Sequence, residues 1–149
     1  MPSIPCMPCM ISENRVINYL RISIIDRCNL ACRYCVPKGM LPPLSQSDII
    51  RYEEIIRIVN IAACLGISKI RVTGGEPLVR KGLFPFIKEI SNIKGIDEIS
   101  ITTNGVLLEK NLKNILDSGI KRINISLDTL KPDRFIHISG KDYFKTVWR

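Results

Sequence analysis

The stretch "KIRVTGGEPLVRKGLFPFIKEISN", residues 69–92, is decisive for the fold because it contains one complete strand–helix unit. Its opening, "KIRVTGG", is rich in β-branched residues and runs into a glycine pair, which predicts a strand that ends in a turn. Its close, "LFPFIKEISN", has the apolar spacing of a helix, and Pro85 is tolerated in the first turn of a helix. The stretch therefore predicts a βα unit with a short connection.

The same alternation of strand and helix occurs on both sides of this stretch. The sequence predicts further strands over residues 19–26, 97–105 and 121–128. It predicts helices over residues 52–66 and 107–119, a short helix from Pro132, and the start of another over 142–149. Four strands that alternate with helices indicate an α/β fold with a parallel sheet covered by helices.

Unusual sequences follow the end of each predicted strand. A cysteine-rich segment follows the first strand, "TGGEP" the second, "TTNG" the third and "SLD" the fourth. Parallel α/β folds bind their ligands at the carboxyl ends of the strands. The sequence therefore predicts one site at this edge of the sheet.

The composition of the 149-residue chain is that of one globular domain, with 46% hydrophobic and 24% charged residues. Its apolar runs are too short to span a membrane, and its N-terminus lacks the pattern of a secretion signal. We therefore expect a cytoplasmic protein with reduced cysteines. The formal net charge of +8 favours an anionic ligand, either nucleic acid or a small polyphosphate. The scattered positive charges are equally typical of a solvated surface.

The segment "DRCNLACRYC", residues 26–35, holds three of the six cysteines, at Cys28, Cys32 and Cys35. Three ligands at spacings of four and three residues cannot share a rigid strand, so they would have to wrap around a metal from a loop. Structural zinc takes four ligands, and the fourth would then come from Cys6, Cys9, Cys64 or His137. A 4Fe–4S cluster held by three thiolates instead leaves one iron open for another ligand. Both kinds of site remain possible at this point.

The Cys-x3-Cys-x2-Cys spacing, with "GGEP" after the second strand, resembles the radical S-adenosylmethionine superfamily. The longer stretches "NYLRISIIDRCNLACRYCVPKG", "KIRVTGGEPLVRKGL", "ISITTNGVLL" and "INISLDTLKPDRFIHISG" are similar to successive motifs of GTP 3′,8-cyclases. This resemblance implies a partial TIM-type (βα) barrel, truncated after about four βα units. It also implies a radical S-adenosylmethionine core over residues 15–149, preceded by an N-terminal extension over residues 1–14.

The resemblance implies three sets of site residues. Ligands of a 4Fe–4S cluster would be Cys28, Cys32 and Cys35. Contacts to S-adenosylmethionine would come from Tyr34, Gly74, Gly75, Glu76 and Ser126. Contacts to GTP would come from Arg21, Arg71 and Thr102. The arginines suit this role, because a guanidinium binds phosphate oxygens through two hydrogen bonds. Without the resemblance, the arginines would be ordinary surface residues, the glycines a plain turn, and the hydroxyls ordinary strand ends.

The activity that the resemblance implies is a step of molybdenum cofactor biosynthesis, catalysed by a lyase that cyclises GTP. A reduced cluster would cleave S-adenosylmethionine to a 5′-deoxyadenosyl radical, and this radical would start the conversion of GTP to 3′,8-cyclo-7,8-dihydro-GTP. The expected partners are GTP, a flavodoxin-like or ferredoxin-like reductant, and a C-terminal half or a second copy of the chain. Neither nucleic acid nor a membrane is expected as a partner. Alternatives are a radical S-adenosylmethionine enzyme that modifies peptides, and a non-catalytic zinc-binding module.

Length is the main departure from the family pattern. Family members continue for roughly as many residues again and carry a second cluster that helps to bind GTP. We therefore expect the outer edge of the fourth strand to be unpaired. We also expect the chain alone to bind a cluster, to cleave S-adenosylmethionine slowly at best, and not to cyclise GTP. Smaller expectations are that Cys64 packs in the core, that His137 is structural, and that Cys6 and Cys9 precede a translation start at Met10.

Overall fold

The computed structural model describes residues 16–35, 44–45 and 47–149. The strands are β1 (Tyr19–Ser23), β2 (Lys69–Thr73), β3 (Glu98–Thr103) and β4 (Arg122–Ile125). The helices are α1 (Tyr52–Cys64), α2 (Leu83–Ser91), α3 (Leu108–Asp117), α4 (Pro132–Ser139) and α5 (Phe144–Trp148), with a 3₁₀ helix, η1 (Pro77–Val79), before α2. The expected N-terminal extension, with Cys6 and Cys9, lies outside the described residues.

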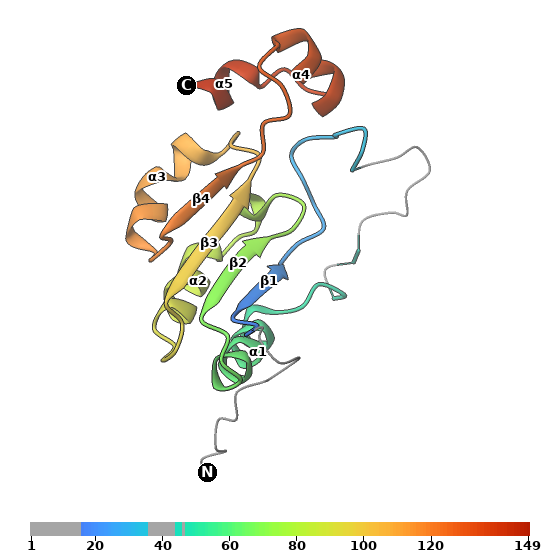
Figure 1. The fold of residues 1–149 in the computed structure, drawn as a ribbon. Helices are drawn as coiled ribbons and strands as arrows, with labels where there is room; N and C mark the ends of the chain where they lie inside the picture. Colours follow the sequence, from blue (N-terminus) through green and yellow to red (C-terminus); the bar gives the residue numbers. More distant parts are fainter. Residues whose placement is uncertain (1–15, 36–43, 46) are drawn as a thin grey trace.

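The four strands form one parallel sheet in the order β1-β2-β3-β4, so sequence order and spatial order coincide (Figure 1). All three pairings are parallel, and each strand follows the previous one through a helix. This arrangement confirms the predicted α/β class and is part of a (βα) barrel. The described strands leave the outer edge of β4 without a partner, as the sequence analysis expected.

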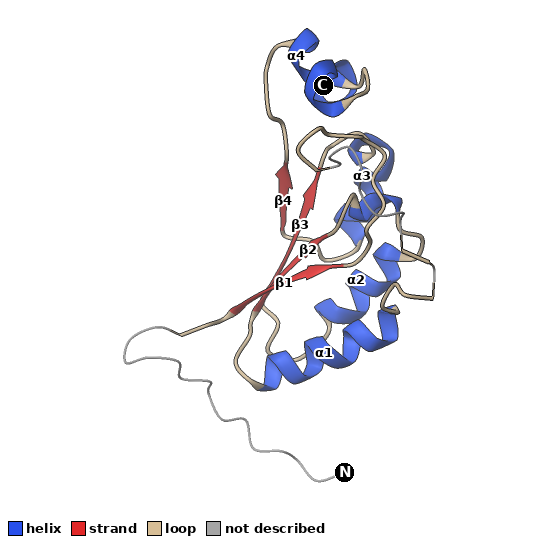
Figure 2. Cartoon of the chain, turned by 90° about the vertical axis from the view of Figure 1, so that its right-hand side faces the viewer, coloured by secondary structure: helices blue, strands red, loops and turns tan. Residues whose placement is uncertain are grey.

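Helices α1, α2 and α3 lie on one face of the sheet, and none of the helices that the structure describes covers the opposite face (Figure 2). Helices α4 and α5 lie beyond the carboxyl ends of the strands (Figure 1). The core between sheet and helices is made mainly of isoleucine. Its fully buried members include Ile55, Val59, Ile70, Val72, Ile87, Ile90 and Ile101. Burying each such side chain contributes about 1.5–3 kcal/mol, so this face holds the sheet and helices together.

The prediction that Cys64 of helix α1 packs in the core is wrong. Ile55, Val59 and Ala62 form the buried stripe of the helix, whereas Cys64 is exposed. Cys64 lies two residues, or about 200°, beyond Ala62 around the helix, so it faces away from the core. An apolar residue type near the stripe was therefore not enough to place Cys64 in the core.

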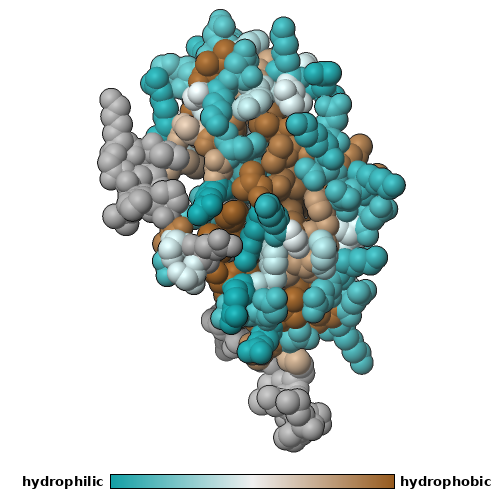
Figure 3. All heavy atoms as spheres, turned by 180° about the vertical axis from the view of Figure 1, so that it is seen from behind, coloured by the Kyte–Doolittle hydropathy of each residue, from teal (hydrophilic) through white to brown (hydrophobic). Residues whose placement is uncertain are grey.

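The outer surface of the helices is mostly polar. Seen from behind, hydrophilic side chains cover much of the molecule, and hydrophobic side chains appear between them (Figure 3). Among the described residues, no helix has both the length and the apolar character that crossing a membrane requires.

Tyr52 begins α1 and packs between two neighbours. Its ring stacks on Phe86 of α2 at 4.5 Å between centroids, and the guanidinium carbon of Arg80 lies 3.9 Å from the centroid of the Tyr52 ring. The hydroxyl is buried and has no hydrogen-bond partner among the described residues. Burial raises the pKa of Tyr52 to about 12, although the charge of Arg80 opposes the rise.

We expect Tyr52→Phe to leave the protein as stable as wild type at neutral pH, or about 1 kcal/mol more stable, because an unpaired buried hydroxyl is lost. The folded state keeps the Tyr52 proton up to about pH 12, whereas the unfolded state loses it near pH 10. Stability should therefore fall between those values as pH rises, and Tyr52→Phe should remove part of that fall. Chemical denaturation at pH 7 and pH 10.5 measures both effects, with Tyr143→Phe as control. A variant that loses several kcal/mol at pH 7 would show that the hydroxyl has a partner.

Candidate cofactor and substrate site

The glycine pair after β2 packs directly against the chain that leaves β1. The amide of Gly75 donates to the carbonyl of Ile25 at 2.6 Å, and the amide of Glu76 donates to the carbonyl of Arg27 at 2.9 Å. A Cβ atom added at Gly75 would lie only 2.6 Å from the carbonyl oxygen of Asp26. Only glycine fits at position 75, because the neighbouring backbone leaves no room for a side chain. This contact fixes the start of the cysteine-rich segment.

Glu76 is fully buried, and three donors bind its carboxylate. The amide of Leu78 donates to Oε1 at 3.0 Å, which caps the start of η1. The Thr103 hydroxyl donates to Oε1 at 2.8 Å, and the Asn104 amide donates to Oε2 at 2.7 Å. Glu76 therefore joins the end of β2 to the end of β3. In this arrangement its carboxylate is occupied by protein donors, and a contact to S-adenosylmethionine stays a prediction.

The cysteine-rich segment is also held from its other side, by α4 and the residues that follow it. The amide of Ala31 donates to the carbonyl of Ser139 at 2.9 Å, and the amide of Arg33 donates to the carbonyl of Ile138 at 3.0 Å. The Lys141 ammonium donates to the carbonyl of Asn29 at 2.7 Å.

Side chains reinforce this attachment. Arg33 lies 3.0 Å from the ring Nε2 of His137, so His137 has a structural contact. The Tyr34 hydroxyl donates to Asp128 at 2.8 Å, and partial burial and this bond raise the pKa of Tyr34. The segment is therefore anchored to residues about 100 positions away in the sequence, a connection that the sequence analysis did not foresee.

Cys28, Cys32 and Cys35 are outside any disulfide, and Cys28 and Cys35 are exposed. Burial raises the pKa of the Cys32 thiol, and the hydrogen bond with Tyr34 lowers it. The charges of Cys35 and Cys28 raise this pKa further, so both lie within electrostatic reach of Cys32. As the described residues lie, no three Cys, His, Asp or Glu side chains are arranged to hold a metal ion. Three thiols on one loop fit an iron–sulfur cluster in their chemistry. Binding would require the loop to bring the sulfurs together.

Two asparagines that the sequence analysis did not select lie beside Cys28. The side-chain amide of Asn104 donates to Asn29 Oδ1 at 2.7 Å and lies 3.6 Å from Cys28 Sγ. The backbone amide of Leu30 also donates to Cys28 Sγ, at 3.4 Å. The signal was present in "TTNG", whose asparagine follows β3 at the edge where the site was expected.

Arg21, Arg71 and Thr102 lie on the face of the sheet opposite helices α1, α2 and α3. Side chains alternate along a strand, and the intervening residues Ile70, Val72, Ile99 and Ile101 belong to the core on the helical side. Arg21 and Arg71 are directly paired in register between β1 and β2. The structure thus brings the three predicted GTP contacts to one face.

Hydroxyl groups accept hydrogen bonds from both arginines. Arg21 donates to the Thr73 hydroxyl at 3.5 Å, and Arg71 donates to the Ser100 hydroxyl at 3.4 Å. The Arg71 guanidinium also lies 5.3 Å from the centroid of the Tyr19 ring. These contacts hold the guanidinium groups along the face without neutralising them.

Residues of β4 and the chain after it complete this end of the sheet. Ser126 is exposed, and its amide donates to the carbonyl of Thr103 at 2.8 Å, so the β3–β4 pairing continues past β4. Asn124 pairs in register with Thr102, and its side-chain nitrogen is buried without a hydrogen-bond partner in the described part of the chain. Asn124 was not among the residues predicted from the sequence.

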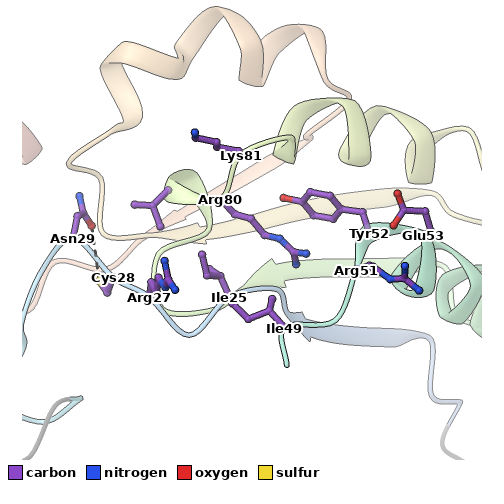
Figure 4. A pocket seen from close by; sticks show the side chains of 11 residues that line it. Ile25, Arg27, Cys28, Asn29, Ile49, Arg51, Tyr52, Glu53, Arg80 and Lys81 are labelled. Atoms are coloured by element: carbon purple, nitrogen blue, oxygen red, sulfur yellow. Dashed lines mark hydrogen bonds between the residues drawn. The ribbon is translucent and has the colours of Figure 1, made fainter. Parts of the chain in front are cut away.

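A cavity of about 780 Å³ lies beside Cys28 and Asn29, between the segment after β1, the start of α1 and the turn before α2. Figure 4 shows the basic side chains of Arg27, Arg51 and Lys81 around it. Arg80 also lines the cavity, but its guanidinium donates to the carbonyls of Ile24 and Ile50, so it is used by the fold. The cavity does not include the predicted GTP contacts.

Comparison with known proteins defines the class of this fold and site. The family model of the radical SAM superfamily matches residues 22–149, and the chain therefore belongs to this superfamily. Two crystal structures of BtrN share the fold. The open conformation has a TM-score of 0.58 at 21% identity and is matched over 82% of this chain and 55% of that one. The complex with AdoMet and 2-DOIA has a TM-score of 0.57 at 17% identity, over 90% of this chain and 56% of that one.

More similar relatives are GTP 3′,8-cyclases. The enzyme of Moorella thermoacetica is 50% identical over 135 residues, which are 91% of this chain and 42% of the relative. That of Thermodesulfovibrio yellowstonii is 55% identical over 123 residues, 82% of this chain and 38% of the relative. The predicted resemblance is confirmed, and the chain spans about two fifths of these relatives' length. A 4Fe–4S cluster and S-adenosylmethionine, the cofactors predicted from the sequence, are those of this superfamily.

We expect Gly75→Ala to destabilise the fold by more than about 3 kcal/mol, because the added Cβ would collide with backbone rather than with a movable side chain. Gly66→Ala is the matched control. Its Cβ would meet nothing within 4 Å, and only its positive φ of 94° opposes the change, at about 1–2 kcal/mol. Denaturant unfolding of both variants gives the comparison. Equal losses would show that the Gly75 contact is not a constraint.

Proposed function

We propose that this chain is the cofactor-binding part of a radical S-adenosylmethionine enzyme of the GTP 3′,8-cyclase type, with residues 15–149 as its core and residues 1–14 as an extension. The observation that carries the substrate assignment is the pair Arg21 and Arg71. They are directly opposite each other on neighbouring strands. Like charges in that position repel each other, so the face on which they lie favours an anion between them.

No acidic side chain forms an ion pair with either arginine among the described residues, whose ion pairs are Arg51–Glu54 and Arg122–Glu98. An arginine that served only the fold would gain from such a partner. A triphosphate would supply the missing charge and accept paired hydrogen bonds from each guanidinium. Thr102, on the same face one strand further, would add a hydroxyl. GTP on the open face of the sheet is consistent with all three positions.

The cofactor end of the site would use the residues at the strand ends. Cys28, Cys32 and Cys35 would hold the cluster, and Tyr34, Gly74, Gly75, Glu76 and Ser126 would surround S-adenosylmethionine. When bound, the cluster and S-adenosylmethionine supply the electron transfer and the radical that start the reaction on GTP. The chain's own residues position the substrate face relative to this end. A flavodoxin-like or ferredoxin-like donor would bring the electron.

The free edge of β4 is the place where a further βα unit would pair. Ile125 of β4 is half exposed there. An unpaired edge with apolar side chains favours pairing with another strand. We propose that this strand comes from a C-terminal half or from a second copy of the chain.

We expect anaerobic reconstitution to give about four irons and four sulfides per chain. Cys32→Ala should lose the cluster, because one of three thiolate ligands is removed. Cys64→Ala is the matched control, since Cys64 is an exposed cysteine of α1 and lies outside the segment. Iron, sulfide and zinc analysis measures the result. Zinc without sulfide in the wild-type chain would contradict the cluster and support a zinc-binding module.

We expect Arg71→Ala to weaken GTP binding by about tenfold or more, because hydrogen bonds between charged groups are lost. Arg71→Lys should lose less, since it keeps the charge and loses only the planar pairing. Arg57→Ala, an exposed arginine of α1 on the helical side, is the control for net charge. Titration calorimetry with GTP measures all three. Equal weakening by Arg57→Ala and Arg71→Ala would mean that only overall charge attracts GTP.

A further inference from the structure

We propose that Asn104 is a positioning residue that donates a hydrogen bond to the sulfur of Cys28 and thereby raises the reduction potential of the cluster. This inference rests on the proposed function, in which Cys28 is a cluster ligand. Its basis is the contact between Asn104 Nδ2 and Cys28 Sγ, at 3.6 Å. Asn104 comes from the end of β3, 76 residues away from Cys28 along the chain. The contact is therefore made by the fold and not by local sequence.

The orientation of the Asn104 side chain is determined by its other hydrogen bonds. The backbone amide of Val106 donates to Asn104 Oδ1 at 3.0 Å, so the oxygen of the side chain faces its own turn. The nitrogen then faces Cys28 and donates to Asn29 Oδ1 at 2.7 Å. The reverse orientation would place oxygen against oxygen at Asn29 and nitrogen against the Val106 amide. The network thus directs an N–H group toward the sulfur.

The position of Asn104 is fixed as firmly as its orientation. Its backbone amide donates to the buried carboxylate of Glu76 at 2.7 Å, and Thr103 before it donates to the same carboxylate. The Thr103 hydroxyl in turn accepts from the amide of Gly105 at 3.1 Å. A donor held in this way loses little freedom when it binds the sulfur, and supporting bonds of this kind orient the residues around a metal centre.

The physical effect follows from charge. An N–H group that points at a thiolate ligand stabilises negative charge on the sulfur, and a cluster is more negative after it gains an electron. Hydrogen bonds to the sulfurs therefore favour the reduced state and raise the potential. The amide of Leu30 supplies a second donor to the same sulfur. Because that donor is backbone, only the Asn104 contribution can be removed by substitution.

The decisive variants are Asn104→Asp and Asn104→Ser. Aspartate keeps an oxygen for the Val106 amide and replaces the donor with a second oxygen. Serine is neutral, can still accept in the turn, and is too short to reach the sulfur. Asn114→Asp, on the exposed side of α3, is the control that adds the same charge away from the segment. Each protein is reconstituted with iron and sulfide, analysed for cluster content, and titrated with dithionite while the reduced cluster is followed by electron paramagnetic resonance.

We expect full cluster content in all four proteins and a lower potential in both Asn104 variants. The ratio of reduced to oxidised cluster at a fixed potential should fall about tenfold in Asn104→Asp, which corresponds to 59 mV for one electron, and less in Asn104→Ser. Asn114→Asp should leave the potential unchanged. A shift in Asn104→Asp without any shift in Asn104→Ser would show an effect of charge alone and overturn the inference. Unchanged potentials, or cluster loss in both Asn104 variants, would overturn it too. A wild-type chain that takes up no cluster would overturn both the inference and the proposed function.

Discussion

The site depends on the hydrogen bonds that the buried carboxylate of Glu76 accepts. A carboxylate removed from water is costly unless donors replace the lost water, and here three donors do so. Hydrogen bonds to a charged group contribute about 1.5–3 kcal/mol each. Because the donors belong to η1 and to the end of β3, the carboxylate joins the chain after β2 to the end of β3, beyond the last residues paired between these two strands, Val72 and Ile101. The amide of Glu76 donates to the carbonyl of Arg27, so the chain after β1 is joined to the same residue. Three of the four strand ends therefore meet at one residue.

The cysteine-rich segment is held between two attachments. One is the glycine turn and Glu76, and the other is the end of α4 with Lys141. Neither attachment uses a cysteine, so the three thiols stay available at an exposed loop while the backbone around them is fixed. A loop that binds a cluster would benefit from a fixed backbone combined with available thiols. The backbone is held on both sides of Cys28 and on both sides of Cys32, and Cys35 follows the last of these contacts.

The strands, helices and their order could be predicted from the sequence, because local apolar periodicity and glycine positions decide them. The edge that gathers Cys28, Gly75, Thr102 and Ser126 could also be predicted, since parallel strands end at the same side. The burial of Glu76 could not be, because two of its three donors, Thr103 and Asn104, lie 27 and 28 residues away at the end of β3. Cys64 was wrongly predicted to be in the core, because a small apolar residue beside the buried stripe of a helix can be either buried or exposed. Asn104 follows β3 at the predicted edge, but its contact with Cys28 joins residues 76 positions apart and could not be predicted.

The end of β3 connects the predicted substrate face to the predicted cofactor end, because its successive side chains point to opposite faces of the sheet. Thr102 and Thr103 are neighbours, so their side chains point to opposite faces of the sheet. Thr102 lies on the open face with Arg21 and Arg71, whereas the Thr103 hydroxyl binds Glu76. The next residue, Asn104, reaches Cys28. A displacement of β3 would therefore move the predicted substrate face and the predicted cluster ligand together. In the proposed function, three consecutive residues, Thr102, Thr103 and Asn104, would link the substrate face to the cofactor end.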